Sequence, residues 1–482
     1  MLFEHGEFMP DQPDFGNPGS TISKNTYPSP RGYKPFGGLV YLSTAMDAYP
    51  RGGQSLTSQD GTSKVYAGND TKLYSLDTGA TTDRSKAGGY TSTATFWDFA
   101  AYGDIAIATN FKDAIQSINM SSGTDYADLT TDFKARTCAV VRDFLMFGNT
   151  NDAVDGDRPE RIRWSALGDY TDYTISATTQ ADFQDTPGGG AVQRIFGGEY
   201  AVALFEHSIY RINYVGSPTV FQFDAVETER GLFTAGAAAQ NGNIVYYLDS
   251  DGFYAFNGSQ SSPIGNERVD SWFWRTLDAS QAHRISCAVD HDSKCVMWSF
   301  PSQTNISGEP THILIFNYEI NKWSYAEIDH NMIIPLLTSD FTLETLDSLN
   351  NDIDALDLSV DSRVLFEGSA LLGIIESNKL ASNQGSPLTA IVESKEMQPS
   401  AGRRSHVTEV WPLSDAATTL IQVGTRDRLQ DAYTYDTAVA VNAQGFAPVN
   451  SEGRYIRIMQ TISGDWKDTQ GADVVTKQRG RF

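Results

Sequence analysis

Histidines, cysteines and carboxylates are the side chains of this chain most able to do chemistry, and their spacing predicts no catalytic or metal site. The seven histidines stand singly, at His5, His207, His283, His291, His312, His330 and His406. Cys138, Cys287 and Cys295 lie in apolar, strand-like segments without a CxxC spacing, which indicates neither a zinc site nor a disulfide framework. His283 and His291 share a hairpin region with two of these cysteines, but strand alternation places both at strand ends or turns. We expect no metal and no cofactor.

Motifs for nucleophilic catalysis and phosphate binding are also missing from the sequence. There is no GxSxG elbow, and Ser165 lies in "RWSALGD", a strand-to-turn context. The glycine-rich "PGGGAV" lacks the Walker lysine and no helical pattern follows it. We therefore expect no enzyme activity. Besides the two functions described at the end of this section, a third hypothesis is a glycan hydrolase. Such an enzyme would need two carboxylates flanked by arginines in an axial cleft.

The net charge is the most informative bulk property. The chain has 482 residues, with 60 acidic and 36 basic side chains, and a formal charge of −24. Such a chain does not grip nucleic acid by neutralising phosphates. The acid excess favours either plain solubility or a repulsive surface along which a polyanion slides. The opening "MLFEHGEF" does not resemble a signal peptide, and no apolar run reaches membrane-spanning length. We expect a soluble protein made in the cytoplasm, without membrane insertion.

Short alternating strands joined by Gly, Asn and Asp turns recur along most of the chain. The clearest turn is Ser250-Asp251-Gly252, between "IVYYL" and "FYAF". Six such units span residues 64–77, 98–120, 142–174, 195–224, 241–265 and 285–328. Units of about four strands at intervals of about 40–50 residues are typical of propeller blades, which must stack to bury both faces. The sequence predicts an all-β fold with a β-propeller of about six blades. The alternative is an irregular all-β sandwich.

Changes in composition divide the chain into four parts. Residues 1–37 form an extended arm, since six of the 18 prolines fall within 6–36 without any hydrophobic periodicity. We assign 38–340 to the propeller, 341–364 to an acidic linker and 365–482 to a C-terminal antiparallel β domain resembling a sandwich. The linker lacks the Gly and Glu that an EF-hand calcium loop requires.

Several strings resemble bacteriophage virion proteins. They are "GEFMPDQPDFGNPGSTISKNTYPSPRGYKPFGGL", "RIRWSALGDYTDYT", "GGEYAVALFEHSIYRINYVGSPTVFQFDAVETERG", "VYYLDSDGFYAFNG" with "PIGNERVD", and "GRYIRIMQTISGDWKDTQGADV". Specifically, they resemble the tail hub or nozzle proteins of short-tailed phages, also described as packaged-DNA stabilisation proteins. The resemblance touches the arm, several blades and the C-terminal part.

The resemblance implies a structural virion protein of the phage tail, assembled in the host cytoplasm. Such proteins form a six-fold homo-oligomeric ring below the portal and its adaptor, the head-tail connector. The ring retains packaged double-stranded DNA, conducts it during ejection without sequence-specific binding, and anchors tail fibres or spikes. The alternative is a peripheral propeller module that docks a host glycan or a receptor-binding protein.

Two sets of candidate functional residues follow. Phe8, Phe15 and Tyr33 are candidate anchors by which the arm crosses to a neighbouring subunit. The arm could instead tie the propeller to the C-terminal domain, or fold back on its own propeller. The second set consists of candidate channel-facing acids, at Glu344, Asp347, Asp352, Asp354 and Asp357. Acids suit a DNA channel because each cation facing the lumen would add a phosphate contact that must break in transit.

Overall fold

A computed structural model describes residues 1–13, 16–77, 79–91, 94–338 and 368–480 of the chain. The chain is mostly β, with 53% strand and 3% helix. The two short helical segments of the described residues are α1 (Asp270–Thr276) and the 3₁₀ helix η1 (Ala279–Arg284). The all-β prediction is therefore confirmed.

Four-stranded antiparallel sheets make up the larger part of the molecule. The first sheet consists of β6 (Gly52–Thr57), β7 (Ser63–Gly68), β8 (Leu73–Asp77) and β9 (Ala80–Asp83). The second consists of β10 (Asp98–Tyr102), β11 (Ile105–Thr109), β12 (Ile115–Asn119) and β13 (Ala127–Thr130). The third consists of β14 (Phe133–Val141), β15 (Phe144–Asp152), β16 (Gly156–Trp164) and β17 (Asp182–Asp185). Two more follow: β18 (Val192–Phe196), β19 (Ala201–Phe205), β20 (Ile209–Gly216) and β21 (Val220–Glu227); β22 (Ala238–Asn241), β23 (Ile244–Leu248), β24 (Phe253–Phe256) and β25 (Ser261–Pro263). In each sheet the strands pair in chain order, as local hairpins do.

Local turn chemistry explains this order. The predicted hairpin turn at Ser250-Asp251-Gly252 is confirmed, because β23 and β24 pair on either side of it, with Leu248 opposite Phe253. The Asp249 and Gly252 backbones bond across the turn, and Gly252 has a φ of 152°. Glycine reaches such positive φ values without the steric cost that a Cβ adds.

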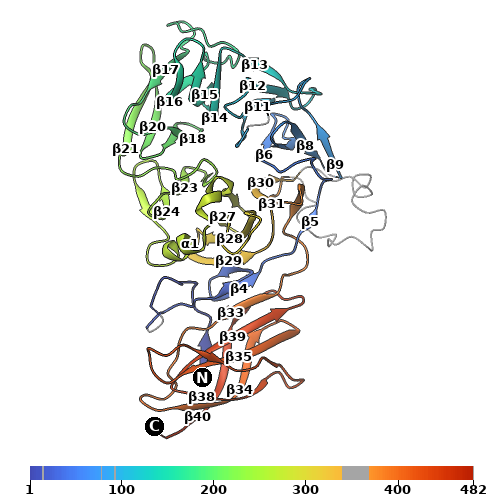
Figure 1. Cartoon of the computed structure of the whole chain (residues 1–482), viewed down its shortest axis with the longest axis vertical. Helices are drawn as coiled ribbons and strands as arrows, with labels where there is room; N and C mark the ends of the chain where they lie inside the picture. Colours follow the sequence, from blue (N-terminus) through green and yellow to red (C-terminus); the bar gives the residue numbers. More distant parts are fainter. Residues whose placement is uncertain (14–15, 78, 92–93, 339–367, 481–482) are drawn as a thin grey trace.

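Two further sets of four strands complete the series. β26 (Ser286–Asp290), β27 (Cys295–Pro301), β28 (Pro310–Asn317) and β29 (Lys322–Glu327) pair in order but belong to a larger, ten-stranded sheet. The last set consists of β30 (Met332–Leu337), β31 (Ala370–Glu376), β32 (Lys379–Ser382) and β5 (Val40–Tyr41). Figure 1 shows these sets side by side around a common centre, which is a propeller-like arrangement.

The structure thus has seven four-stranded sets among its described residues, where the sequence predicts about six units. The set that the sequence analysis misses joins strands from three distant segments. β30 precedes the acidic segment, β31 and β32 follow it, and β5 comes from the N-terminal side. Pairing over such sequence separations leaves no local periodicity to detect. It also carries the sheet pairing across the boundary predicted near residue 365.

The C-terminal part consists of two sheets that share one core. One contains β33 (Ala390–Glu393), β39 (Tyr455–Ser463), β35 (Thr418–Arg426), β36 (Thr434–Tyr435) and β37 (Val439–Ala440). The other contains β40 (Thr469–Gln478), β34 (Ser405–Ser414), β38 (Ala447–Gly453) and β1 (Leu2–Glu4), with β3 (Thr26–Ser29) and β4 (Gly32–Pro35) at its edge. Apolar side chains of both sheets form a single buried cluster, for example Val410 and Val474 against Ile421 and Ile458.

Part of the N-terminal arm, including β4, lies between these two parts (Figure 1), whereas its first strand, β1, pairs with β40 in the C-terminal sheet. Its strand β2 (Ser23–Lys24) pairs parallel to β29 through Lys24 and Tyr325, and antiparallel to β33 through Ser23 and Val392. This strand of two residues makes one ten-stranded sheet out of β26–β29 and the C-terminal strands. The described part of the arm therefore contributes four short strands, β1 to β4, to sheets of its own chain.

Candidate functional site

The surface on which the arm packs, formed by α1, β29 and β33, is called the seat of the arm. It is the best-defined candidate site among those that the sequence predicts. Phe8 has 0% exposure and packs against the rings of Trp272 and Tyr325, with centroid distances of 5.3 and 4.9 Å. Trp272 lies on α1, and Tyr325 lies on β29. Aromatic pairs in such tilted and edge-to-face arrangements stabilise beyond the burial of their area. Phe8 is therefore an anchor of the arm on its own chain.

Asp11 fixes the arm to the start of α1. Its two carboxylate oxygens accept hydrogen bonds from the backbone N–H groups of Ser271 and Trp272, each at 2.7 Å. The first N–H groups of a helix lack partners within the helix, so a carboxylate placed there satisfies them and faces the positive end of the helix dipole. Asp270 lies beside this contact. Burial raises its pKa to about 6, with Asp11 and Asp251 adding in the same direction, while the N–H of Phe253 opposes the shift.

Tyr33, the second predicted anchor, closes the arm upon itself. It has 3% exposure, and its hydroxyl donates to the carbonyl oxygen of Gly6 at 2.7 Å. It also pairs with Thr469 of β40, so β4 meets the C-terminal sheet at this point. Gly32 makes this approach possible, because a Cβ there would lie 1.9 Å from the Thr469 carbonyl oxygen. Phe15, the third predicted anchor, lies outside the described residues.

Polar side chains secure the short strand β2. Lys24 forms an ion pair with Glu327 of β29, and Thr21 donates to the carboxylate of Glu393 at 3.0 Å. Asn25, which has a φ of 57°, donates to the Thr389 carbonyl and accepts from the Glu327 N–H. Each contact joins the arm to β29, to β33 or to Thr389, the residue just before β33.

Two further anchors of the arm, Tyr27 and Phe36, were not predicted from the sequence. Tyr27 and Phe36 stack at 5.1 Å and are buried in a cluster with Met297 of β27 and Ile374 of β31. Their aromatic types were visible, but the strands that receive them lie far along the chain. Phe8 and Tyr33, which were predicted to contact a neighbouring subunit, are buried by their own chain. Contact with a neighbour would require both side chains to leave these positions. The contacts of the arm with both β29 and β33 correspond to the predicted alternative in which the arm ties two parts together.

All five candidate channel-facing acids fall within 339–367, outside the described residues. These are Glu344, Asp347, Asp352, Asp354 and Asp357. Their predicted place on a channel lumen stays a prediction.

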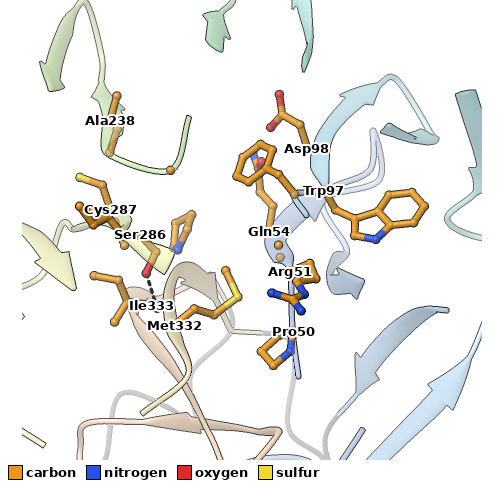
Figure 2. A pocket seen from close by; sticks show the side chains of 18 of the residues that line it. Pro50, Arg51, Gln54, Trp97, Asp98, Ala238, Ser286, Cys287, Met332 and Ile333 are labelled. Carbon is orange, nitrogen blue, oxygen red and sulfur yellow. Dashed lines mark hydrogen bonds between the residues drawn. The ribbon is translucent and has the colours of Figure 1, made fainter. Parts of the chain in front are cut away.

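A cavity of about 250 Å³ lies where the first strands of six sheets converge: β6, β10, β18, β22, β26 and β30. Figure 2 shows Arg51 and Met332 facing each other across it, while Trp97 points away from Ala238 and Cys287. The N–H of Ile333 donates to the Ser286 hydroxyl at 2.9 Å, which joins two of the walls (Figure 2).

Arginines outnumber carboxylates in this cavity. The charged side chains among its described lining residues are Arg51, Arg194, Arg284 and Asp98, and His283 and His291 also line it. Asp98 accepts hydrogen bonds from the Thr137 hydroxyl at 2.5 Å and from the Cys138 N–H at 3.1 Å. It also lies 3.7 Å from Arg194. A hydrolase with two acidic groups in the cleft would need a second carboxylate beside Asp98.

A serine-histidine pair lies elsewhere, in the core. The Ser299 hydroxyl and His330 Nε2 are 2.6 Å apart, and Nδ1 of the same ring bonds to the Ile328 carbonyl. Burial lowers the pKa of His330 to about 4. Ser299 has 0% exposure and His330 has 2%, so a substrate has no access to the pair. We assign it to the polar packing between β27 and the segment before β30.

The cysteines are likewise core residues. All three are buried, and burial raises the pKa of each thiol well above its usual value. The thiolate is the reactive form, so these thiols are poor nucleophiles. In the described part of the chain, no group of three or more His, Cys, Asp or Glu side chains is placed to hold a metal ion. Among the described residues, no helix is long and apolar enough to cross a bilayer.

Neither a scan against protein-family models nor a search of curated proteins finds a match to this sequence.

Proposed function

We propose that this protein is a structural subunit of a phage tail, which forms a hexameric nozzle or hub ring below the portal and adaptor. The ring would retain packaged DNA, conduct it during ejection and anchor fibres or spikes. The sequence resemblance supplies this hypothesis. The structural observation that carries it is β2, which joins β29 and β33 into one continuous sheet.

A continuous sheet suits a subunit that must hold its shape under load. Two parts connected only by a linker would move relative to each other by default. Here backbone hydrogen bonds run through the arm, Phe8 fixes the arm to β29, and Asp11 fixes it to α1. The subunit can therefore keep its two parts in one orientation while DNA passes.

We infer further that the seven four-stranded sets are the blades of a β-propeller. Two observations support this. β6 lies beside both β10 and β30, the first strands of the sheets on either side of it. β5, which precedes β6 in the sequence, completes the sheet of β30. A blade built from strands near both ends of the propeller sequence would join the first blade to the last. No long edge strand would then stay unpaired.

The ring hypothesis predicts two properties of the purified protein. Native mass spectrometry and electron microscopy should find a closed oligomer of six copies, which is a heterologous assembly with two different patches on each subunit. At low salt, a gel-shift assay should find no stable complex with double-stranded DNA, because the net charge is −24. A monomer, or tight DNA binding, would overturn the proposal.

The second candidate function is a peripheral module that recognises a host glycan or a receptor-binding protein. The cavity lined by Arg51, Arg194 and Arg284 favours it, since it offers cationic groups in a concave, partly apolar setting. A monomer or trimer whose cavity binds a glycan would favour this function over the ring.

A further inference from the structure

We propose that the cavity between the first strands of the sheets binds a small oxyanion, namely a carboxylate or phosphate group carried by a compact organic body. The inference concerns residues 49–54, 95–99, 194, 196, 283–289 and 291 and the other residues of the lining. It goes beyond the structural role proposed above and does not rest on it. A ring subunit could hold such a ligand, and so could a monomer.

The lining of the cavity has more cationic than acidic side chains, whereas the protein as a whole has more acidic than basic ones. The whole chain has 60 acidic and 36 basic residues, so an average pocket should carry more carboxylates than cations. The described lining residues include three arginines and one aspartate. Arg51 pairs with Asp70, and Arg194 lies 3.7 Å from Asp98. A concave site with an excess of one charge sign still concentrates counter-ions of the opposite sign.

The arginines retain donors for a ligand. Arg51 donates from Nε to Asp70 at 2.6 Å, and Arg284 donates from Nη1 to the Gly308 carbonyl at 3.0 Å. A guanidinium has five N–H donors. Nε of Arg284 is buried and has no hydrogen-bond partner among the described residues. That atom has no accessible surface, so the donors open to an oxyanion are the other guanidinium N–H groups of these arginines, which form strong charge-assisted hydrogen bonds.

Two of the arginines converge on one aromatic ring. The guanidinium carbons of Arg51 and Arg284 lie 5.4 and 4.8 Å from the centroid of the Tyr49 ring. His283 lies close to both: burial lowers its pKa, and the charges of Arg284 and Arg51 lower it further. Like charges held together repel, and an anion between them would relieve that repulsion.

Apolar groups form the rest of the wall and suit the body of the ligand. Arg194 lies 5.1 Å from the ring centroid of Phe196 and 6.0 Å from that of Phe96. Met332 faces the cavity opposite Arg51 (Figure 2). At about 250 Å³ the cavity is larger than a void of about 150 Å³ that accepts benzene, and lies below the range of about 300–1,000 Å³ typical of sites for drug-sized ligands. The size indicates a ligand no larger than a single sugar.

Asp98 does not make this a hydrolytic site. It is the only carboxylate among the described lining residues, and both β14 contacts, Thr137 and Cys138, use the same Oδ2 atom. Its other oxygen faces Arg194. The proposal is therefore one of binding, without a covalent step.

Isothermal titration calorimetry of the full chain tests the proposal with four probes. Glucuronate and glucose 6-phosphate carry a carboxylate or a phosphate on one sugar, inorganic phosphate is the anion alone, and glucose is the neutral control. We expect at least one anionic probe to bind with a Kd below about 1 mM, and glucose to bind at least about tenfold more weakly. Binding of inorganic phosphate alone would identify a free anion as the ligand. Binding of glucuronate alone would identify a carboxylate on an organic body, and binding of glucose 6-phosphate alone would identify a phosphate on such a body. Binding of glucose as tightly as the anions, or no binding by any probe, would overturn the proposal.

Two variants locate the binding. Arg284→Gln removes the guanidinium, and the affinity should fall by about tenfold or more. Arg142→Gln is the matched control: Arg142 pairs with Glu199 in a more exposed position outside the cavity, so the affinity should not change. Gln54→Glu adds a carboxylate to the wall without removing an arginine, and it should weaken anion binding by about tenfold or more even if Arg284→Gln fails to fold. Unchanged affinity in a folded Gln54→Glu variant would overturn the assignment.

Discussion

Replacing Phe8 by alanine should release the arm from its seat. The side chain is completely buried against Trp272 and Tyr325, so the change removes the transfer free energy of a phenyl ring and leaves a cavity behind. Losses for buried Phe→Ala changes are about 3–5 kcal/mol. The loss should act on the free energy of opening the arm, because Phe8 joins the arm to α1 and β29.

Amide hydrogen exchange measures that free energy directly. The Asn25 N–H next to β2 donates to the Tyr325 carbonyl at 2.8 Å, and its protection reports on the closed arm. In Phe8→Ala its exchange should accelerate by roughly two to four orders of magnitude, since every 1.4 kcal/mol is tenfold. Leu429→Ala, at a side chain with 40% exposure in the C-terminal part, is the control and should leave this amide unchanged. Less than tenfold acceleration in Phe8→Ala would refute the assignment of Phe8 as an anchor.

Three further predictions concern the arm and its surroundings. The pKa of Asp270 is raised to about 6, so the folded state binds the proton more tightly than the unfolded state, and stability should fall as pH rises from about 4 to 6. Asp270→Asn should abolish that slope in urea unfolding and be about 1–2 kcal/mol more stable than the parent at pH 7, a figure reduced because the carboxyl is partly exposed; an unchanged slope would contradict it. Asp11→Ala should cost about 0.5–2 kcal/mol through loss of the cap on α1, and should also lower the pKa of Asp270 measured by carboxyl NMR; a higher pKa would contradict it. Gly32→Ala should destabilise the chain by about 1–3 kcal/mol, because its Cβ would overlap the Thr469 carbonyl, whereas Gly480→Ala, with open space around it, should be neutral in the same unfolding assay; equal effects would contradict this reading.

Local features of the fold could be predicted from the sequence because local chemistry determines them. The turn at 250–252 specifies a hairpin without reference to the rest of the chain. The pairing of β5 with β32 could not be predicted, since Val40 and Ser382 meet only in the folded chain. β2 has two residues, too few for any periodic signal.

The candidate site shows the same division. The aromatic residues of the arm marked Phe8 and Tyr33 as anchors, but only the structure identifies what they anchor to. The sequence revealed no convergent set of arginines, because Arg51, Arg194 and Arg284 are far apart along the chain. The first strands of three different sheets, or the residues just before them, bring these arginines to one cavity.

Cryo-electron microscopy of the particle that contains this chain tests the central claim most directly. We predict a six-fold ring on the tail axis, with the arm seated between β29 and β33 of its own subunit and a DNA-wide channel through the ring. A monomer or trimer at the periphery of the particle, with the arginine-lined cavity directed outward, would contradict the nozzle role and support a recognition module instead.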